Sequence, residues 1–338
     1  MLTMFVVLEG FDIGAGMLQF VVGKTEAERR TVIAAIGPLW SWHEVWLVGF
    51  GGTFLLAFPA MMTAAFSGFY LALFLLVWSL VLRGVSIEVS GHIEDGMWRV
   101  AWHFCFVVSN VLIAVLVGAA LGNVVRGVPV DSQGAFSLPL FTNFRPDGNV
   151  GILDWYTLSV AVFLLLTLAA HGATGLAQRT DGRVNDRSTK TAKFLWKVVL
   201  SLLPIITVET SQVRPGFFSA IVSQPFGWVG VLGVAVGCIS VFRGLSLRHE
   251  TGAFTGSIMF IAGLMVAGAT GIFPRILRST IAPEYSLSAY GSAADAHSLA
   301  VGIVWWPIAL VFSLGYFCFI YRNYSGKVRL AQDTQAPY

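Results

Sequence analysis

Long apolar segments recur along nearly the whole of this 338-residue chain, and they constrain its fold more than any other feature. A transmembrane helix needs about 20 predominantly apolar residues to cross the hydrocarbon core of a bilayer. Nine such segments are present, at approximately 1–22, 44–61, 63–83, 99–125, 154–178, 194–210, 226–243, 252–273 and 298–321. The sequence therefore predicts an all-α, polytopic membrane protein with about nine transmembrane helices, built as a single membrane domain over residues 1–338.

The composition supports this prediction and excludes one class of partner. Charged residues make up only 12% of the chain, whereas a soluble domain carries about 25%. Most of the surface is therefore expected to face lipid or protein. The net charge of +3 is too small and too scattered to indicate a nucleic-acid partner. The first apolar segment begins abruptly, eight residues before Glu9, so we expect a truncated first helix or a chain start assigned too late.

Lysine and arginine residues divide unequally between the two sets of loops that nine helices would create. If the amino terminus lies outside, 16 of the 21 fall inside and five fall outside. Because positive residues concentrate on the cytoplasmic side of membrane proteins, this predicts an N-out and C-in topology. Segment 126–153 is then an outside loop expected to pack over that end, and segment 179–193 is an inside loop. The inside set is Lys24, Arg29, Arg30, Arg83, Arg99, Arg179, Arg183, Arg187, Lys190, Lys193, Lys197, Arg243, Arg248, Arg322, Lys327 and Arg329.

Two carboxylates, Glu9 and Asp12, lie inside the first apolar segment. A charged side chain at the centre of a membrane helix costs about 2.5–3.5 kcal/mol on insertion scales, so such residues usually face a partner or a water path. Their spacing of three places them on one helical face. They cannot both stay ionised in a dry site, so one is expected to hold a proton. We interpret the pair as part of a proton path or polar lining; the alternative is a pair satisfied by hydrogen bonds within the bundle.

A second polar group stands at the start of the second predicted helix. Trp40, Trp42 and Trp46 are typical of the aromatic belt at a membrane interface. His43 and Glu44 lie side by side at the helix entrance, where they would relay protons from water to the carboxylates of the first helix. The alternative for His43 is a hydrogen-bonded structural histidine.

Three further polar residues are interpreted as structural. Arg99 lies at a predicted cytoplasmic helix end, where its side chain can extend to the interface. His103 lies one turn deeper, and His171 lies near the inner end of the fifth predicted helix. Together with His43, these histidines form no obvious pair of axial haem ligands. HExxH, CxxCH and nucleotide-binding motifs are absent from the sequence, so it predicts no metal site and no redox centre in this chain.

Short motifs follow one another in a fixed order along the chain. They are Glu9–Leu18, Thr25–Arg30, Ile36–Trp40, Glu44–Leu47, Gly51-Gly52, Ala57–Pro59, Phe66–Tyr70, Arg83-Gly84, Trp98-Arg99, Gly122-Asn123, Gly271–Arg275 and Tyr285–Leu287. In this order and spacing the chain resembles subunit II of the cytochrome bd-type quinol oxidases, whose opening helix carries an acidic residue followed by GFD-x-G-x-G-M-L. The resemblance spans nearly the whole chain and is most specific in the first 125 residues.

The resemblance implies a nine-helix subunit in the bacterial cytoplasmic (inner) membrane, paired with a homologous subunit I. That partner carries the b haems, haem d and the quinol-oxidising loop, and the pair oxidises quinol and reduces O2 to water. Protons for water come from the cytoplasm, so charge separates across the membrane without pumping. This chain would supply scaffold and part of the proton path, with Asp12 in the path and Trp40 and Trp46 lining it. Some members hold a structural quinone, for which the resemblance makes Trp40, Trp42 and Trp46 candidate lining residues. The resemblance leaves a small accessory subunit open.

One departure from the family pattern falls in the proposed path. The family usually reads Trp-Asp-Gly-Asn before its Glu/Gln-Val-Trp, whereas this chain reads Trp40-Ser41-Trp42-His43. Ser41 replaces a carboxylate and cannot carry its charge. Either the path runs through His43 and Glu44 instead, or this branch of the family does not use the path. A divergent branch could also use a different electron donor.

Two other classes of function are compatible with the residues alone. A proton-coupled secondary transporter or channel would also place acidic groups in a membrane interior, and the glycine-rich seventh and eighth segments are weak indications of the broken helices common in that class. A purely structural assembly subunit would retain Glu9 and Asp12 without using them.

Overall fold

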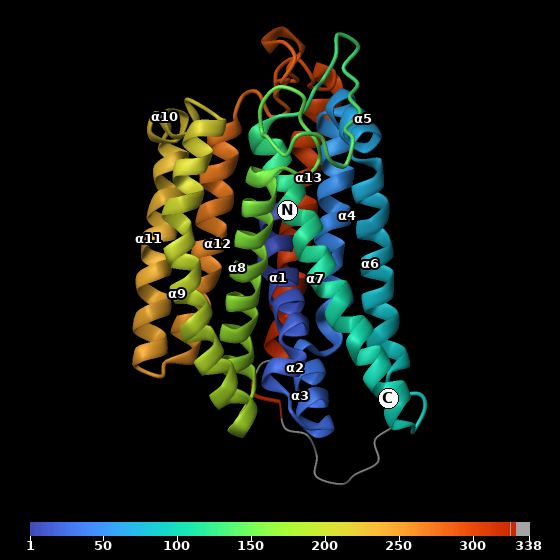
Figure 1. The fold of residues 1–338 in the computed structure, drawn as a ribbon, viewed down its shortest axis with the longest axis vertical. Coiled ribbons are helices and arrows are strands. Elements are labelled where there is room, and N and C mark those ends of the chain that lie inside the picture. Colours follow the sequence, from blue (N-terminus) through green and yellow to red (C-terminus); the bar gives the residue numbers. More distant parts are fainter. Residues whose placement is uncertain (325, 329–338) are drawn as a thin grey trace.

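The computed structural model describes residues 1–324 and 326–328, and this part of the chain is helical apart from loops and two isolated β-bridges. The long helices run side by side along the long axis of the molecule, with the connections gathered at its two ends (Figure 1). The predicted all-α class is confirmed. The α-helices are α1 (Leu2–Met17), α2 (Gln19–Val22), α3 (Glu26–Ile36), α4 (Trp40–Ala57), α5 (Pro59–Gly68), α6 (Tyr70–Val89), α7 (Gly96–Arg126), α8 (Trp155–Arg179), α9 (Gly182–Val213), α10 (Phe217–Val222), α11 (Pro225–Ser246), α12 (Glu250–Ile272) and α13 (Ala296–Asn323).

Seven of the described helices are long and apolar enough to cross a membrane: α6, α7, α8, α9, α11, α12 and α13. The chain is therefore a multi-pass membrane protein. Two of the nine predicted spans fall outside this set, because α1 has only 16 residues and α4 begins with the polar stretch Trp40–Glu44. The count of nine and the N-out orientation stay predictions. Arg329, one of the predicted inside charges, lies outside the described residues.

Several predicted boundaries were wrong. Segment 179–193 is not an inside loop, because α9 is already helical from Gly182. The predicted helix 63–83 is two helices that meet at Phe69, and the second one continues to Val89. The predicted helix 1–22 is interrupted at Leu18, and α3 follows as an additional amphipathic helix. Helices α6 and α9 extend beyond the predicted apolar segments into stretches that contain polar residues. Short breaks at Leu18 and Phe69 divide apolar runs that are continuous in the sequence.

Helix α1 lies inside the bundle, where it contacts α4, α7, α8 and α12. Its closest approach is to α8, at Gly14 and Gly172. A Cβ atom on Gly14 would lie only 2.9 Å from the Cα atom of Gly172 and 2.8 Å from the carbonyl carbon of Leu168. Small residues at such crossings let membrane helices pack backbone to backbone. This packing holds the carboxylates of α1 deep inside the protein.

The segment between α7 and α8 covers one end of the bundle, as expected from the sequence (Figure 1). Val128, Val130 and Phe136 from this segment form a hydrophobic cluster with Met61 of α5 and Leu277. A buried ion pair between Arg126 and Asp154 joins the two ends of the segment. This cap closes the end of the molecule opposite to α2 and α3.

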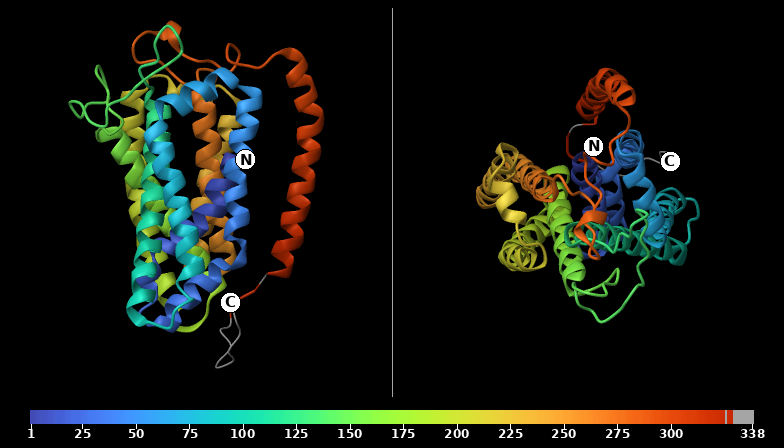
Figure 2. Two further views of the ribbon diagram at one scale, coloured as in Figure 1. Left: turned by 90° about the vertical axis from the view of Figure 1, so that its right-hand side faces the viewer. Right: turned by 90° about the horizontal axis from the view of Figure 1, so that it is seen from above.

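Helix α13 stands at the rim of the bundle, separated from the other helices along much of its length (Figure 2). None of the residues from Ala296 to Asn323 is buried. Two hydrogen bonds connect it to α4: Trp306 Nε1 donates to Thr53 Oγ1 at 3.1 Å, and the Tyr321 hydroxyl lies 2.7 Å from His43 Nε2. Its apolar outer face is therefore free to meet lipid or another subunit.

Candidate functional site

Three carboxyl groups converge on one guanidinium inside the bundle. Arg83, from α6, donates through Nη1 to Glu9 Oε1 and to Glu44 Oε1, the latter at 2.8 Å. Its Nη2 atom lies 3.6 Å from Asp12 Oδ2. The side chains of Glu9, Asp12 and Arg83 are fully buried, and that of Glu44 is 26% exposed. The sequence indicates the three acidic residues as polar-site candidates, but it predicts Arg83 to be one of the inside positive charges at a helix end. The structure corrects this prediction, because Arg83 is buried among the three carboxyl groups.

The charges in this cluster do not balance when every carboxyl group is ionised. Three carboxylates face one guanidinium, which would leave two negative charges in a buried site. Glu9 Oε2 and Asp12 Oδ1 are also buried without a hydrogen-bond partner among the described residues. Because an uncompensated buried charge is expensive, the cluster favours a proton on at least one carboxyl group. A site that takes up a proton for this reason can also release it.

His43 connects this cluster to α13. Its Nδ1 atom lies 2.6 Å from Asp12 Oδ2, and its Nε2 atom lies 2.7 Å from the Tyr321 hydroxyl. When Nδ1–H donates to the carboxylate, Nε2 accepts from the hydroxyl. A proton that arrives at Nε2 can then leave from Nδ1, so the imidazole is placed to pass a proton between Tyr321 and Asp12. Sequence reasoning missed Tyr321, because nothing in the last apolar segment indicates which residue meets α4.

The three tryptophans occupy different environments. The guanidinium of Arg83 lies over the Trp40 ring, 5.9 Å from its centroid. Trp46 is buried against Phe317, with 5.2 Å between ring centroids. Trp42 is 40% exposed on the outer side of α4. Trp40 therefore lies beside the ionic cluster, whereas Trp46 packs against α13 and Trp42 faces outward. The role of the three tryptophans as a quinone lining stays a prediction.

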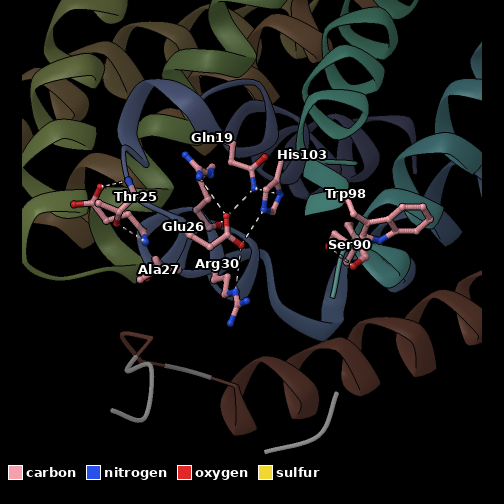
Figure 3. Close-up of polar contacts among 12 residues, drawn as sticks. Gln19, Thr25, Glu26, Ala27, Arg30, Ser90, Trp98 and His103 are labelled. Carbon is pink, nitrogen blue, oxygen red and sulfur yellow. Dashed lines mark hydrogen bonds and ion pairs between the residues drawn. The ribbon is translucent and has the colours of Figure 1, made fainter. Parts of the chain in front are cut away.

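A second polar group lies at the end of the bundle that carries α3. Figure 3 shows Gln19 and Glu26 pointing toward His103, at 3.1 Å from Nδ1 and 3.4 Å from Nε2 respectively. Because the amide nitrogen of Gln19 can only donate, Nδ1 accepts and Nε2–H donates to Glu26. Burial raises the pKa of Glu26, but His103 together with Arg29 and Arg30 outweighs burial and holds this pKa below its ordinary value. The carboxylate that faces His103 is therefore ionised near neutral pH.

His171 and Arg99 have contrasting surroundings. His171 is fully buried, with Nδ1 at 2.7 Å from Ser257 Oγ and Nε2 at 2.9 Å from the Val7 carbonyl oxygen. Because a carbonyl oxygen only accepts, Nε2 carries the proton, and the ring ties α8 to α1 and α12. Arg99 is half-buried at the start of α7, and its side chain has no hydrogen-bond or ion-pair partner within residues 1–324 and 326–328.

The donor groups do not fit a haem in this chain. His43, His103 and His171 each use both ring nitrogens in hydrogen bonds, so none offers a nitrogen to an iron atom. The other histidines of the described chain are exposed: His92, His249 and His297. Ligand atoms of Glu9, Asp12 and His43 lie within 4.8 Å of one another, as in a metal site. The guanidinium of Arg83 is bonded among them, however, and its charge opposes binding of a second cation.

Fold and site together define a multi-pass helical membrane protein with an internal cluster of carboxyl groups, arginine and histidine. Residues 1–324 match the family described as cytochrome bd terminal oxidase subunit II, and the chain belongs to that family. It is similar to the probable cytochrome oxidase subunit 2 of Haemophilus influenzae, with 27% identity over 96% of this chain and 91% of the relative. It is 26% identical to the cytochrome bd-I ubiquinol oxidase subunit 2 of Escherichia coli K12 over the same shares, and 25% identical to the Bacillus subtilis cytochrome bd ubiquinol oxidase subunit 2 over 88% and 84%.

A solved structure supports the fold independently. A chain of the bd oxidase from Geobacillus thermodenitrificans superimposes with a TM-score of 0.74, covering 96% of this chain and 94% of that chain, at 16% identity. At this identity the likeness concerns the arrangement of helices alone. The family match makes the chain subunit II of a bd-type oxidase and gives no support to a transporter or channel.

Proposed function

We propose that this chain carries protons within a cytochrome bd-type quinol oxidase, beside a haem-bearing subunit I that oxidises quinol and reduces O2 to water. The relatives named as ubiquinol oxidase subunits support the quinol as electron donor. The family match supports haems b and d in the partner subunit. The complex would reside in the bacterial inner membrane. On the family likeness, a structural quinone would lie beside Trp40 and Trp46, and a small accessory subunit would complete the assembly.

The observation that carries this proposal is the buried cluster around Arg83. Glu44 is partly exposed and bonded to the same Nη1 atom as Glu9, so it provides a connection between the surface and the interior. His43 provides a second connection to Asp12. Protons taken up at the cytoplasmic side would pass through Glu44 and His43 to the two buried carboxyl groups, and from there toward the partner subunit. No electron-transfer group is needed in this chain for that role.

A second line of polar groups approaches the same carboxyl groups from α3. Gln19, the first residue of α2, follows Asp12 by seven residues, beyond the break at Leu18. The amide of Asn110 lies between them, against Gly16, and its Oδ1 atom is buried without a partner in the described chain. Glu26, His103, Gln19 and Asn110 thus lead from the surface toward Asp12. Both lines end at Asp12, which makes this residue the most informative one to change.

The assembly can be tested by purifying the complex through a tag on this chain and recording a reduced-minus-oxidised optical spectrum. We expect bands of b-type haems together with a haem d band. Bands of b-type haem alone would assign the chain to a divergent branch. A colourless preparation of the chain by itself would contradict the proposed partner.

Asp12→Asn tests the proton path, because the amide keeps the shape of the side chain but cannot take up and release a proton as a carboxyl group does. In the purified complex we expect quinol-driven oxygen consumption to fall by as much as roughly 10²-fold, the lower end of what a positioned proton-transfer group contributes. The haem spectrum should not change. A larger ratio of the rates in H2O and D2O should accompany the loss, because proton delivery then limits turnover.

Glu209→Gln is a matched control, since it changes a partly buried carboxyl group into an amide on α9, where Ser159 is its hydrogen-bond partner. This variant should turn over at the wild-type rate. Wild-type turnover and an unchanged solvent isotope effect in Asp12→Asn would remove Asp12 from the mechanism. Equal losses in both variants would indicate damage to the assembly rather than to a path.

A further inference from the structure

A hollow of about 390 Å³ opens between the end of α11 and the start of α12. The turn between α11 and α12 lies at the same end of the molecule as α3 (Figure 1). Ser240 and Arg243 line it from α11, and Thr251 and Thr255 line it from α12, with His249 from the connecting turn. Spacings of three and four residues place each helical pair on one face, toward the hollow.

The unpaired charge at this hollow is positive. Arg243 and the neighbouring Arg248 are exposed, and neither side chain has a hydrogen-bond or ion-pair partner in the described part of the chain. The acidic residue of the turn, Glu250, is already engaged by Lys327 Nζ at 2.7 Å and by Asn185 Nδ2 at 2.6 Å. A negatively charged ligand would therefore meet free guanidinium groups and little repulsion.

The uncharged donors around Arg243 suit the same kind of ligand. The imidazole of His249 lies directly against Gly252, so close that a methyl group at position 252 would collide with Nδ1. His249 directly precedes α12, and its side chain and that of Thr251 both line the hollow. Guanidinium, imidazole and hydroxyl donors around one hollow match the oxygen atoms of a phosphate group.

An apolar surface continues from the hollow toward the middle of the bundle. Leu232, Val236 and Ile239 of α11 are 59%, 42% and 66% exposed, and Met259 of α12 is 36% exposed. This surface provides a contact for hydrocarbon chains directly beyond the polar hollow. A free phosphate ion would use the hollow alone, whereas a lipid would use both.

We propose that this hollow binds a phosphate group, carried by an anionic phospholipid whose acyl chains lie along α11. Arg243 contributes the charged contact, and His249, Ser240, Thr251 and Thr255 contribute hydrogen bonds. The predicted topology places the site in the cytoplasmic leaflet, where the headgroup would hold the turn between α11 and α12 at the membrane surface.

Native mass spectrometry of the purified complex, titrated with phosphatidylglycerol, tests the site. Because a charge-assisted hydrogen bond is worth about 1.5–3 kcal/mol, Arg243→Gln should weaken binding by at least roughly tenfold. Arg183→Gln is the matched control: it removes an exposed arginine at the same end of the molecule, without a partner among residues 1–324 and 326–328. That variant should bind the lipid as the wild type does.

Two further comparisons decide the source of the phosphate. Zwitterionic phosphatidylcholine should bind more weakly than phosphatidylglycerol, and inorganic phosphate should not displace the lipid. Displacement by inorganic phosphate would assign the hollow to a free ion and overturn the lipid proposal. Equal lipid binding by wild type, Arg243→Gln and His249→Gln would overturn the site itself. An unchanged haem spectrum in each variant establishes that the complex is intact.

Discussion

Replacing Arg83 with glutamine tests whether the guanidinium compensates the buried carboxyl groups. Arg83 bonds to Glu9 and Glu44 and faces Asp12, and its side chain is fully buried. Breaking a buried ion pair by removing one partner costs about 3–5 kcal/mol. Each kcal/mol lowers Tm by about 2–4 °C in a protein of 150–250 residues. Because the shift per kcal/mol falls as chain length rises, we expect Arg83→Gln to lower the Tm of this 338-residue subunit within the complex by several °C.

The double variant Arg83→Gln/Glu9→Gln separates the charge effect from loss of packing. It removes a carboxylate together with the guanidinium, so much of the stability should return. The readout is thermal unfolding of the whole complex, followed by circular dichroism and by loss of haem absorbance. Arg99→Gln serves as control, since this half-buried arginine has no side-chain partner in the described chain; changes away from such contacts usually stay within about 0.5 kcal/mol.

The outcome that refutes this reasoning is an Arg83→Gln complex whose Tm equals that of the Arg99→Gln control. The carboxyl groups would then be neutral without help from Arg83, and the charge imbalance would not drive proton uptake. A double variant that is less stable than Arg83→Gln alone would show that the side-chain volume matters more than the charge.

Two other expectations follow from single contacts. His43→Gln keeps a hydrogen-bonding amide between Asp12 and Tyr321 but cannot pass a proton from one side of the ring to the other, so oxygen consumption should fall and its ratio in H2O and D2O should rise. An unchanged rate and an unchanged ratio would favour a structural role. The hydrogen bond from Arg187, together with backbone donors of Thr25 and Lys24, lowers the pKa of Glu28 from 4.5 to about 2. The ionised Glu28 carboxylate therefore stabilises α3 above about pH 4.5, and this stabilisation is lost as the pH falls toward 2. Hydrogen exchange of α3, measured relative to that of α8, should rise on acidification. Glu28→Gln should abolish this rise.

The sequence predicted the helical class because long apolar segments have few alternatives to spanning a membrane. It was less informative where helices leave the apolar region. The first part of α9 is polar overall, so hydropathy alone predicts a loop there, although its buried residues recur at helical spacing: Val184, Ser188, Ala192 and Leu195. Helix α3 begins with a capping box formed by Thr25 and Glu28, a local signal that hydropathy does not report.

The candidate site was only partly predictable for a different reason. Glu9 and Asp12 drew attention because carboxylates are rare inside apolar helices. Arg83 is 74 residues from Glu9 along the chain, and it ended a predicted span, so it resembled an ordinary charge at the cytoplasmic border. His103 was interpreted as structural from its own segment alone, yet it bridges Gln19 and Glu26 from two other helices. Contacts of this kind depend on how helices pack, which spacing along one helix does not specify.

The packing of α4 also bears on the departure from the family pattern at Ser41. Within α4, His43 and Glu44 bond to the ionic cluster, whereas Ser41, one turn before Glu44 on the same face, is exposed and has no side-chain hydrogen bond in the described chain. The carboxylate that the family usually carries at this position would lie one helical turn from Glu44. In this chain the contacts of Asp12 and Arg83 form without that carboxylate. Of the two explanations that the sequence left open, the geometry favours a path that runs through His43 and Glu44.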